Sequence, residues 1–339
     1  MKKNLAFLVF IVIITVFLTT ACDSNNNKKY DYLVLVNKYS QLPDDWEKNV
    51  ELVDAKNAWD EDVKIEKETY ENYKKLKASL EKEGITIELD SIYRSVKEQQ
   101  ELWDDWSNDP EKGLEYVKKY VAVPGYSEHH TGLAVDICLK KDGKLIDDND
   151  DMIAEKEIFS KIHAKLADYG FILRYLDGRD DITGYAYEPW HLRYVGSKKI
   201  AKEIMDKDIT FEEYLDSIKD VVNTPAAAKY QVEKTLKEKL ENDIYKGEIE
   251  NCRFNVTKIY TQKDVENNEA IKSLKLGKED IAFEVTYQLQ PKDDVDINKL
   301  TIPDGEYDEK LGWVVNINRL GILRKDNNKY KLDNFGTGW

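Results

Sequence analysis

Cysteine and histidine are both scarce in this chain of 339 residues. Three cysteines are too few for a disulfide framework. The four histidines are His129, His130, His163 and His191, so any grouping of them is informative about the chemistry of a site. Basic residues do not outnumber acidic ones: 51 Lys and Arg stand against 66 Asp and Glu, which gives a formal net charge of −15. Binding to nucleic-acid phosphates needs clustered Lys and Arg, so the composition argues against DNA or RNA as a partner.

The N-terminus lacks an apolar run long enough to span a bilayer. Residues 5–18 are uncharged and apolar, but the run is shorter than the roughly 20 residues that a membrane-spanning helix needs. Because it follows Lys2 and Lys3, it fits the hydrophobic region of a signal peptide. The run ends in Leu18-Thr-Thr-Ala-Cys22, which resembles the cleavage site of bacterial lipoproteins, although Thr19 stands where an apolar residue is usual.

We therefore expect residues 1–21 to be a lipoprotein signal peptide and Cys22 to carry the lipid. Such a protein lies outside the cytoplasm, anchored to the cell membrane. An ordinary signal peptide and an uncleaved anchor are the alternatives. The polar, low-complexity residues 22–31 are expected to form a flexible tether between the membrane and the folded part.

The rest of the chain is predicted to be α+β, in two domains and without internal repeats. In residues 32–218, apolar positions near the 3.6-residue period predict helices, and a two-residue alternation or a short apolar run predicts strands. Ser95 and Glu98 form a capping-box pattern that marks a helix start. The helices are expected over 62–82, from 96 onward and over 155–169, and the strands over 85–89 and 132–139.

A second, smaller α+β domain is expected over residues 226–339. The composition changes near Pro225, which is typical of a helix start after a linker. A charged helix is predicted over 228–243, followed by strands at 252–260, 281–289, 312–317 and 330–332. This domain contains no histidine, and its role is left open.

Asp136 is the unusual residue of the apolar run 132–139. A carboxylate in such a strand costs several kcal/mol unless a cation or hydrogen bonds compensate it. With His129 and His191 it offers two imidazoles and one oxygen, the ligand set of a catalytic zinc site that keeps a position open for water. Glu188 precedes His191 by three residues and supplies the carboxylate that zinc hydrolysis uses as a proton carrier. On spacing alone, hydrogen-bonded core histidines and a surface glutamate are the commoner alternative.

The sequence motifs around these residues are more specific than their spacing. Ser127-Glu-His129-His-Thr-Gly132-Leu-Ala-Val-Asp136 and Glu188-Pro-Trp-His191-Leu-Arg-Tyr-Val-Gly196 resemble the paired motifs of the zinc D-alanyl-D-alanine carboxypeptidases. This is the VanY-type family (peptidase family M15), which includes related L,D-carboxypeptidases. Ser91-Ile-Tyr-Arg94-Ser95, with Gln99 downstream, resembles the family's arginine motif, and residues 33–43 resemble its N-terminal entry. The resemblance covers roughly residues 32–218.

The resemblance implies that His129, Asp136 and His191 bind Zn²⁺. It also implies that Glu188 is the general base and acid of a zinc-dependent hydrolysis. The fold implied is an α+β domain, with a small mixed or antiparallel sheet, flanking helices and the metal at the face of the sheet.

Arg94 matches the arginine that the family uses to stabilise the carbonyl oxygen or to hold the substrate. A fixed guanidinium suits this role because it can neutralise a developing oxyanion. Ser127 and Gln99 are expected substrate contacts, with a turn hydrogen bond and helix packing as their respective alternatives. His163 is expected to be structural, and His130 to be a surface or supporting residue, not a ligand.

The implied function is removal of C-terminal D-alanine from peptidoglycan stem peptides, with D,D-carboxypeptidase activity preferred. Activity on the L,D-bond of tetrapeptide stems is an alternative, because both activities occur in this family with the same metal motifs. A non-catalytic lipoprotein that binds the cell wall is a second alternative. The intact Glu188 argues against it, since a binding module would be free to lose the base.

Overall fold

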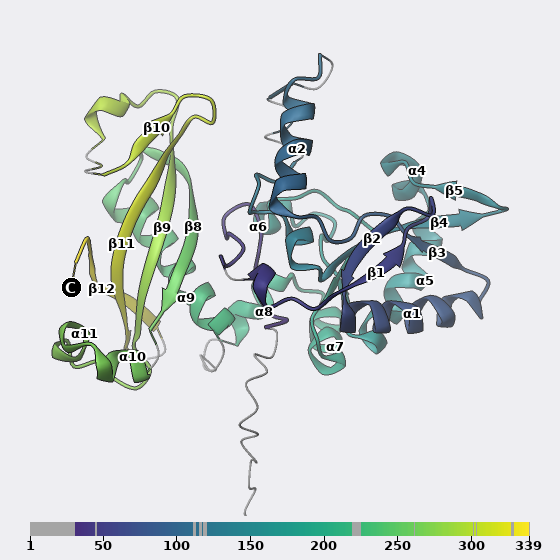
Figure 1. Cartoon of the computed structure of the whole chain (residues 1–339), viewed down its shortest axis with the longest axis horizontal. Coiled ribbons are helices and arrows are strands. Elements are labelled where there is room, and N and C mark those ends of the chain that lie inside the picture. Colours follow the sequence, from purple (N-terminus) through teal and green to yellow (C-terminus); the bar gives the residue numbers. More distant parts are fainter. Residues whose placement is uncertain are drawn as a thin grey trace, which may run out of the picture.

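The computed structural model describes residues 31–44, 46–110, 113–114, 117, 121–218, 225–260, 262–300, 302, 304–326 and 329–338. The predicted signal peptide, Cys22 and all of the predicted tether except Asp31 lie outside these residues. The architecture is α+β, as predicted, with antiparallel sheets in an N-terminal part (31–218) and a C-terminal part (225–338) (Figure 1). In the described ranges, no helix has both the length and the apolar character that a bilayer span needs.

The main sheet of the N-terminal part is antiparallel and has the strand order β3-β4-β7-β6, with β5 also paired to β4. The predicted strand over 132–139 is confirmed as the central strand β4, although it begins at Ala134. The strands are β3 (Thr86–Leu89), β4 (Ala134–Lys141), β5 (Lys144–Ile146), β6 (Phe171–Leu173) and β7 (His191–Tyr194).

A second, two-stranded sheet corrects one prediction. The helix expected over 62–82 begins only at Lys67, because residues 62–66 form strand β2 (Asp62–Glu66), which pairs with β1 (Leu52–Lys56). Val63 and Ile65 fit a two-residue alternation as well as a helical period, and the partner strand decides between them. Glu66 caps helix α1 (Lys67–Glu81): its side chain accepts hydrogen bonds from the first free backbone N–H groups.

The other predicted helices of this part are confirmed. Helix α2 (Val96–Ser107) begins at the capping box formed by Ser95 and Glu98. Helix α5 (Lys156–Leu166) continues into the 3₁₀ helix η3 (Ala167–Tyr169) and ends at Gly170, which has the positive φ of 79° that favours glycine. The remaining short helices are η1 (Trp46–Lys48), η2 (Glu128–Thr131), α4 (Asn149–Ala154), α6 (Asp180–Thr183), α7 (Lys198–Lys207) and α8 (Phe211–Ser217).

Side chains alternate between the two faces of β4, so one face contributes to the core and the other carries Asp136. Val135, Ile137 and Leu139 join a hydrophobic core with residues of α1 and α5, which lie together on one side of the sheet (Figure 1). Because successive strand residues point to opposite faces, Asp136 and Cys138 point away from this core. The carboxylate that the sequence singles out therefore lies on the sheet face opposite these two helices.

The C-terminal part is β-rich and has its own hydrophobic core. Its sheet has the order β10-β11-β9-β8, with β12 paired to β11, and helix α9 packs against it. The predicted helix and four strands are confirmed, whereas β10 was not predicted. The elements are α9 (Pro225–Lys239), the π-helix η4 (Leu240–Ile244), β8 (Ile249–Ile259), α10 (Gln262–Asn267), α11 (Glu269–Ser273), β9 (Ile281–Pro291), η5 (Ile297–Lys299), β10 (Glu306–Asp308), β11 (Trp313–Asp326) and β12 (Lys329–Gly336).

Candidate metal centre

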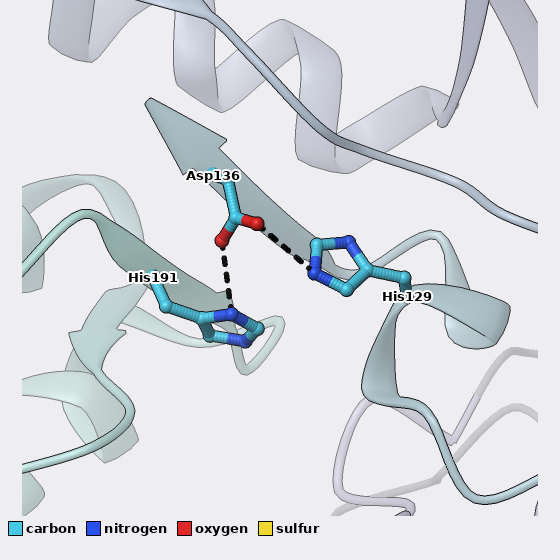
Figure 2. Close-up of side chains that lie close together, drawn as sticks. All are labelled: His129, Asp136 and His191. Atoms are coloured by element: carbon cyan, nitrogen blue, oxygen red, sulfur yellow. Dashed lines mark ion pairs between the residues drawn. The ribbon is translucent and has the colours of Figure 1, made fainter. Parts of the chain in front are cut away.

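The three predicted ligands converge from three elements. Asp136 on β4 lies directly opposite His191 on β7 in the antiparallel register, and His129 comes from η2. The Asp136 carboxylate lies between the two rings, with Oδ1 2.9 Å from His191 Nδ1 and Oδ2 3.2 Å from His129 Nε2 (Figure 2). One ligand atom from each residue lies within 4.8 Å of the others. The geometry can hold a metal ion.

The outer nitrogen of each histidine ring is already engaged. His129 Nδ1 lies 2.6 Å from the carbonyl oxygen of Ile92, and His191 Nε2 lies 3.1 Å from Glu128 Oε2. Both partners accept hydrogen bonds, so each of these nitrogens carries the proton and donates it. The inner nitrogens, His129 Nε2 and His191 Nδ1, then face Asp136 with free lone pairs, which is the arrangement that metal-binding histidines show.

This arrangement requires a proton or a metal ion between His191 and Asp136. With its proton on Nε2, His191 presents a lone pair at Nδ1 to the lone pairs of Asp136 Oδ1, only 2.9 Å away. In this tautomer of His191 the buried Oδ1 has no hydrogen-bond donor. Two acceptors at this distance repel each other unless a proton or a metal ion lies between them. Two imidazoles and a carboxylate fit Zn²⁺, which prefers nitrogen and oxygen donors of this kind.

Glu128 is the most important residue of the site that the sequence did not identify. Its side chain is 1% exposed, and it accepts hydrogen bonds from Arg174 Nε at 2.9 Å and Arg193 Nη1 at 2.5 Å as well as from His191. Both arginine side chains are fully buried. Its position beside His129 in the first motif was the available signal, but only the fold shows that its partners are the arginines.

The buried charges extend to the first described segment of the chain. Arg174 also donates to both carboxylate oxygens of Glu212 on α8, at 2.6 and 2.9 Å. Glu212 in turn accepts from Asn37 Nδ2 at 3.0 Å. Two arginines and two glutamates thus compensate each other where unpaired charges would cost several kcal/mol each.

The charge of Glu128 links His191 to this network of buried arginines and glutamates. Burial disfavours an ionised Glu128, but Arg193 and Arg174 outweigh it and hold the pKa of Glu128 far below its ordinary range. Burial likewise disfavours a charged His191, yet Asp136 and Glu128 prevail and raise the pKa of His191 to about 10. Without a metal ion, His191 therefore holds the proton that a metal ion would displace.

Glu188 lies at the rim of the metal site. It is in the turn before β7, where its carbonyl accepts from the backbone N–H of His191, and its Oε2 lies 3.6 Å from His191 Nδ1. The side chain is partly exposed, unlike that of Glu128. Burial raises the pKa of Glu188 to about 7. Both protonation states are therefore accessible near neutral pH.

Arg94 follows β3 and is fixed from two sides. Its Nη1 donates to Gln99 Oε1 at 2.8 Å and its Nη2 to Ser91 Oγ at 2.9 Å, while its backbone N–H donates to the carbonyl of His129. Gln99 is buried on α2 and donates from Nε2 to the carbonyl of Ala122. Gln99 thus lies behind Arg94.

Ser127, His130 and His163 are not among the three converging side chains. Ser127 is buried at the start of η2 and makes no side-chain cap hydrogen bond there. His130 is buried, not exposed: Nδ1 lies 2.6 Å from the carbonyl of Arg94 and Nε2 accepts from Gly125 N–H. Burial lowers the pKa of His130 to about 4, so it stays neutral. His163 on α5 lies 2.9 Å from the carbonyl of Pro189, a contact inside the fold.

Comparisons with known proteins show what the chain is similar to. Residues 62–197 match the family model VanY, D-alanyl-D-alanine carboxypeptidase. VanXYC of Enterococcus gallinarum, a bifunctional D-Ala-D-Ala dipeptidase and D-Ala-D-Ala carboxypeptidase, is 39% identical over 172 residues, which are 48% of this chain and 83% of that protein. YodJ of Bacillus subtilis is 38% identical over 193 residues, 56% of this chain and 68% of that protein. The solved structure of the LdcB LD-carboxypeptidase is 38% identical, covers 55% of this chain and 86% of that chain, and has a TM-score of 0.47.

Replacing Glu128 tests the support of His191. We expect Glu128→Gln to weaken zinc binding by about 10- to 100-fold, the usual effect of losing a partner that orients a metal-binding histidine. Competition with a chromophoric chelator measures the dissociation constant. Glu66→Gln is the matched control, because the Glu66 side chain is also buried but bonds Tyr32 and the start of α1 instead of a candidate ligand. Equal zinc affinities for both variants would contradict the role of Glu128.

The raised pKa of His191 predicts a pH-dependent metal affinity. Below about pH 10 the metal-free site holds a proton that zinc must displace, so the affinity rises with pH. For one proton released, the apparent dissociation constant falls about tenfold per pH unit. Chelator competition at pH 6, 7 and 8 measures this slope, and His163→Gln should leave it unchanged. A zinc affinity independent of pH would show that no proton is displaced.

Proposed function

The chain belongs to the VanY family of D-alanyl-D-alanine carboxypeptidases, and we propose that it is a zinc-dependent enzyme that removes C-terminal D-alanine from peptidoglycan stem peptides. The observation that carries the proposal is the convergence of His129, Asp136 and His191 with Glu188 at its rim. The proposed catalytic domain comprises residues 32–218, which hold all of these side chains.

His129 Nε2, His191 Nδ1 and Asp136 would hold the zinc ion. Zinc bound there would act as a Lewis acid on water and on the peptide carbonyl. The hydrogen bonds to Ile92 and Glu128 keep both histidines in the tautomers that binding requires. The protein therefore does not have to reorganise these rings when the metal enters.

Glu188 is the proposed proton carrier. Its carboxylate takes a proton from the attacking water and delivers it to the leaving amine of D-alanine as the peptide bond breaks. A group that accepts and then donates a proton works best with a pKa near the working pH, and burial has brought the pKa of Glu188 to about 7. Its partial exposure at the rim leaves it open to the substrate.

Arg94 is proposed to stabilise the negative charge that develops on the carbonyl oxygen. Its guanidinium is held by Gln99 and Ser91, so little reorganisation is needed when the charge appears. Both ends of the Gln99 amide are engaged, by Arg94 and Ala122, so we propose that Gln99 acts by orienting Arg94. Ser127 is proposed as a substrate contact because of its place beside the ligand helix η2.

The location is a proposal from the sequence. The apolar run 5–18 and the motif ending in Cys22 support a lipoprotein anchored outside the cytoplasm by lipid on Cys22. Residues 22–31 would then tether the enzyme near the wall. The proposed substrate lies on the same side of the membrane.

Release of D-alanine from matched stem peptides tests the function. We expect the protein to release D-alanine from a pentapeptide ending in D-Ala-D-Ala, and a chelator to abolish the release. A tetrapeptide ending in a single D-alanine measures the L,D-activity in parallel. Mass spectrometry of the products distinguishes the two bonds.

Glu188→Gln is the control variant for this experiment. It keeps all three proposed ligands, so zinc should stay bound, while the rate falls by about 10²- to 10⁴-fold through loss of proton transfer. If D-alanine is released from the tetrapeptide alone, the protein is an L,D-carboxypeptidase and not a D,D-carboxypeptidase. Zinc-loaded protein that releases D-alanine from neither peptide would contradict the proposed function.

A further inference from the structure

The C-terminal part is joined to the catalytic part through an edge strand. Strand β8 lies at the end of its sheet, and its outer edge pairs with residues 39–41 of the N-terminal part. Ser40 forms a parallel bridge with Phe254, Gln41 N–H donates to the carbonyl of Phe254 at 2.9 Å, and Phe254 N–H donates to that of Tyr39 at 2.7 Å. An edge of β8 that would otherwise present backbone N–H and C=O groups is thereby covered.

Arg253 strengthens this junction with its side chain. Its Nε donates to the carbonyl of Lys38 at 3.1 Å. Its guanidinium carbon lies 3.9 Å from the ring centre of Trp313 on β11 and 5.5 Å from that of Tyr126, just before η2. Arg253 thus contacts the C-terminal sheet, segment 37–42 and the loop that leads to His129. Cation–π contacts of this kind are worth more when they are desolvated.

Helix α9 contacts the same segment with a buried charge. Lys229 is 5% exposed, and its Nζ donates to the carbonyl of Leu35 and to Ser40 Oγ, and pairs with Glu233 at 2.9 Å. Two of these three partners belong to the N-terminal part, so the charge that this junction buries is compensated by groups from both parts.

Segment 37–42 reaches the His129 side of the metal site through hydrogen bonds. Leu42 N–H donates to the carbonyl of Gly125 at 2.8 Å, and Gly125 N–H donates to His130 Nε2 at 3.1 Å. The opposite nitrogen of His130 contacts the carbonyl of Arg94, whose N–H donates to the carbonyl of His129. The position of the segment therefore affects the position of His129, one of the proposed ligands, and of Arg94.

The same segment also reaches His191. Asn37 Oδ1 accepts from the backbone N–H groups of Tyr39 and Ser40 and so shapes the turn of the segment, while its Nδ2 donates to Glu212. From Glu212 the buried network continues through Arg174 and Glu128 to His191. Both histidines thus have supporting contacts that lead back to residues 37–42.

We propose that Arg253 is a positioning residue for the metal site, through which the C-terminal part holds segment 37–42 in place and thereby both histidine ligands. The inference rests on the proposed function for the identity of the metal. It assigns to the C-terminal part a task in the catalytic unit, not only an attachment to it. Arg253 itself touches neither metal nor substrate in this scheme.

Arg253→Met in the full chain tests the inference. It removes the hydrogen bond to Lys38 and the cation between Trp313 and Tyr126 but keeps an apolar stem. We expect the zinc dissociation constant to rise about three- to tenfold, less than for a residue that contacts a ligand directly. Backbone amides of Gln41 and Leu42 should exchange hydrogen faster. We also expect kcat to fall, because His129 and His191 are held less firmly.

Arg319→Met is the matched control. Arg319 lies on β11 of the same sheet, its side chain is 10% exposed, and its partner Asp304 lies within the C-terminal part. The control should lower the stability of that part but change zinc affinity and amide exchange at 39–42 by less than about twofold. Arg253→Lys keeps a cation and a donor, so it should restore part of the affinity. Asn255→Ala, which removes the bond to Asp44, is a milder variant in case Arg253→Met does not fold.

The results separate this inference from the proposed function. Faster exchange at 39–42 without a change in zinc affinity would contradict the positioning role, as would equal effects of Arg253→Met and Arg319→Met or unchanged exchange at 39–42. If the wild-type protein releases D-alanine and any of these contradicting results is found, only the inference fails. If the wild type binds zinc but releases none, the proposed function fails, while the zinc and exchange measurements still decide the inference.

Discussion

The ionised Glu128 beside His191 is the interaction on which the rest of the structure depends. A carboxylate with 1% exposure is stable only if buried cations face it, and Arg174 and Arg193 provide them. These arginines require further partners, which come from Glu212 and from backbone carbonyls of the first described segment. The result is a set of buried charges around His191. It joins Glu128 on η2, Arg174 directly after β6, Arg193 on β7 and Glu212 on α8.

With both histidines neutral, the candidate metal site brings hydrogen-bond acceptors face to face. Asp136 and the inner nitrogens of two histidines point at each other, and the outer nitrogens are already committed as donors. A proton on His191 removes the repulsion with Asp136 when no metal is bound, and a divalent ion that displaces this proton would find the candidate ligands already oriented. Preorganisation of this kind lowers the cost of binding, because the rings do not have to be reoriented.

The sequence was sufficient to predict which three candidate ligands lie together, but not which residues support them. An aspartate in an apolar strand and two histidines in specific motifs could be read locally, and so could the capping box at Ser95. Glu128 could not, because its partners Arg174 and Arg193 lie 46 and 65 residues away. Strand β2 was mistaken for the start of a helix because Val63 and Ile65 satisfy both periods, and only pairing with β1 decides. The docking of β8 on residues 39–41 depends on tertiary contacts that no local pattern contains.

The most direct test of the account is the coordination shell of the bound metal. X-ray absorption spectroscopy of the zinc-loaded protein should show two imidazole nitrogens at about 2.0–2.1 Å together with oxygen donors. Replacing His129 or His191 should remove the imidazole signal or the metal itself. A sulfur shell at about 2.3 Å, or an all-oxygen shell without imidazole, would place the metal elsewhere and contradict the site built by His129, Asp136 and His191.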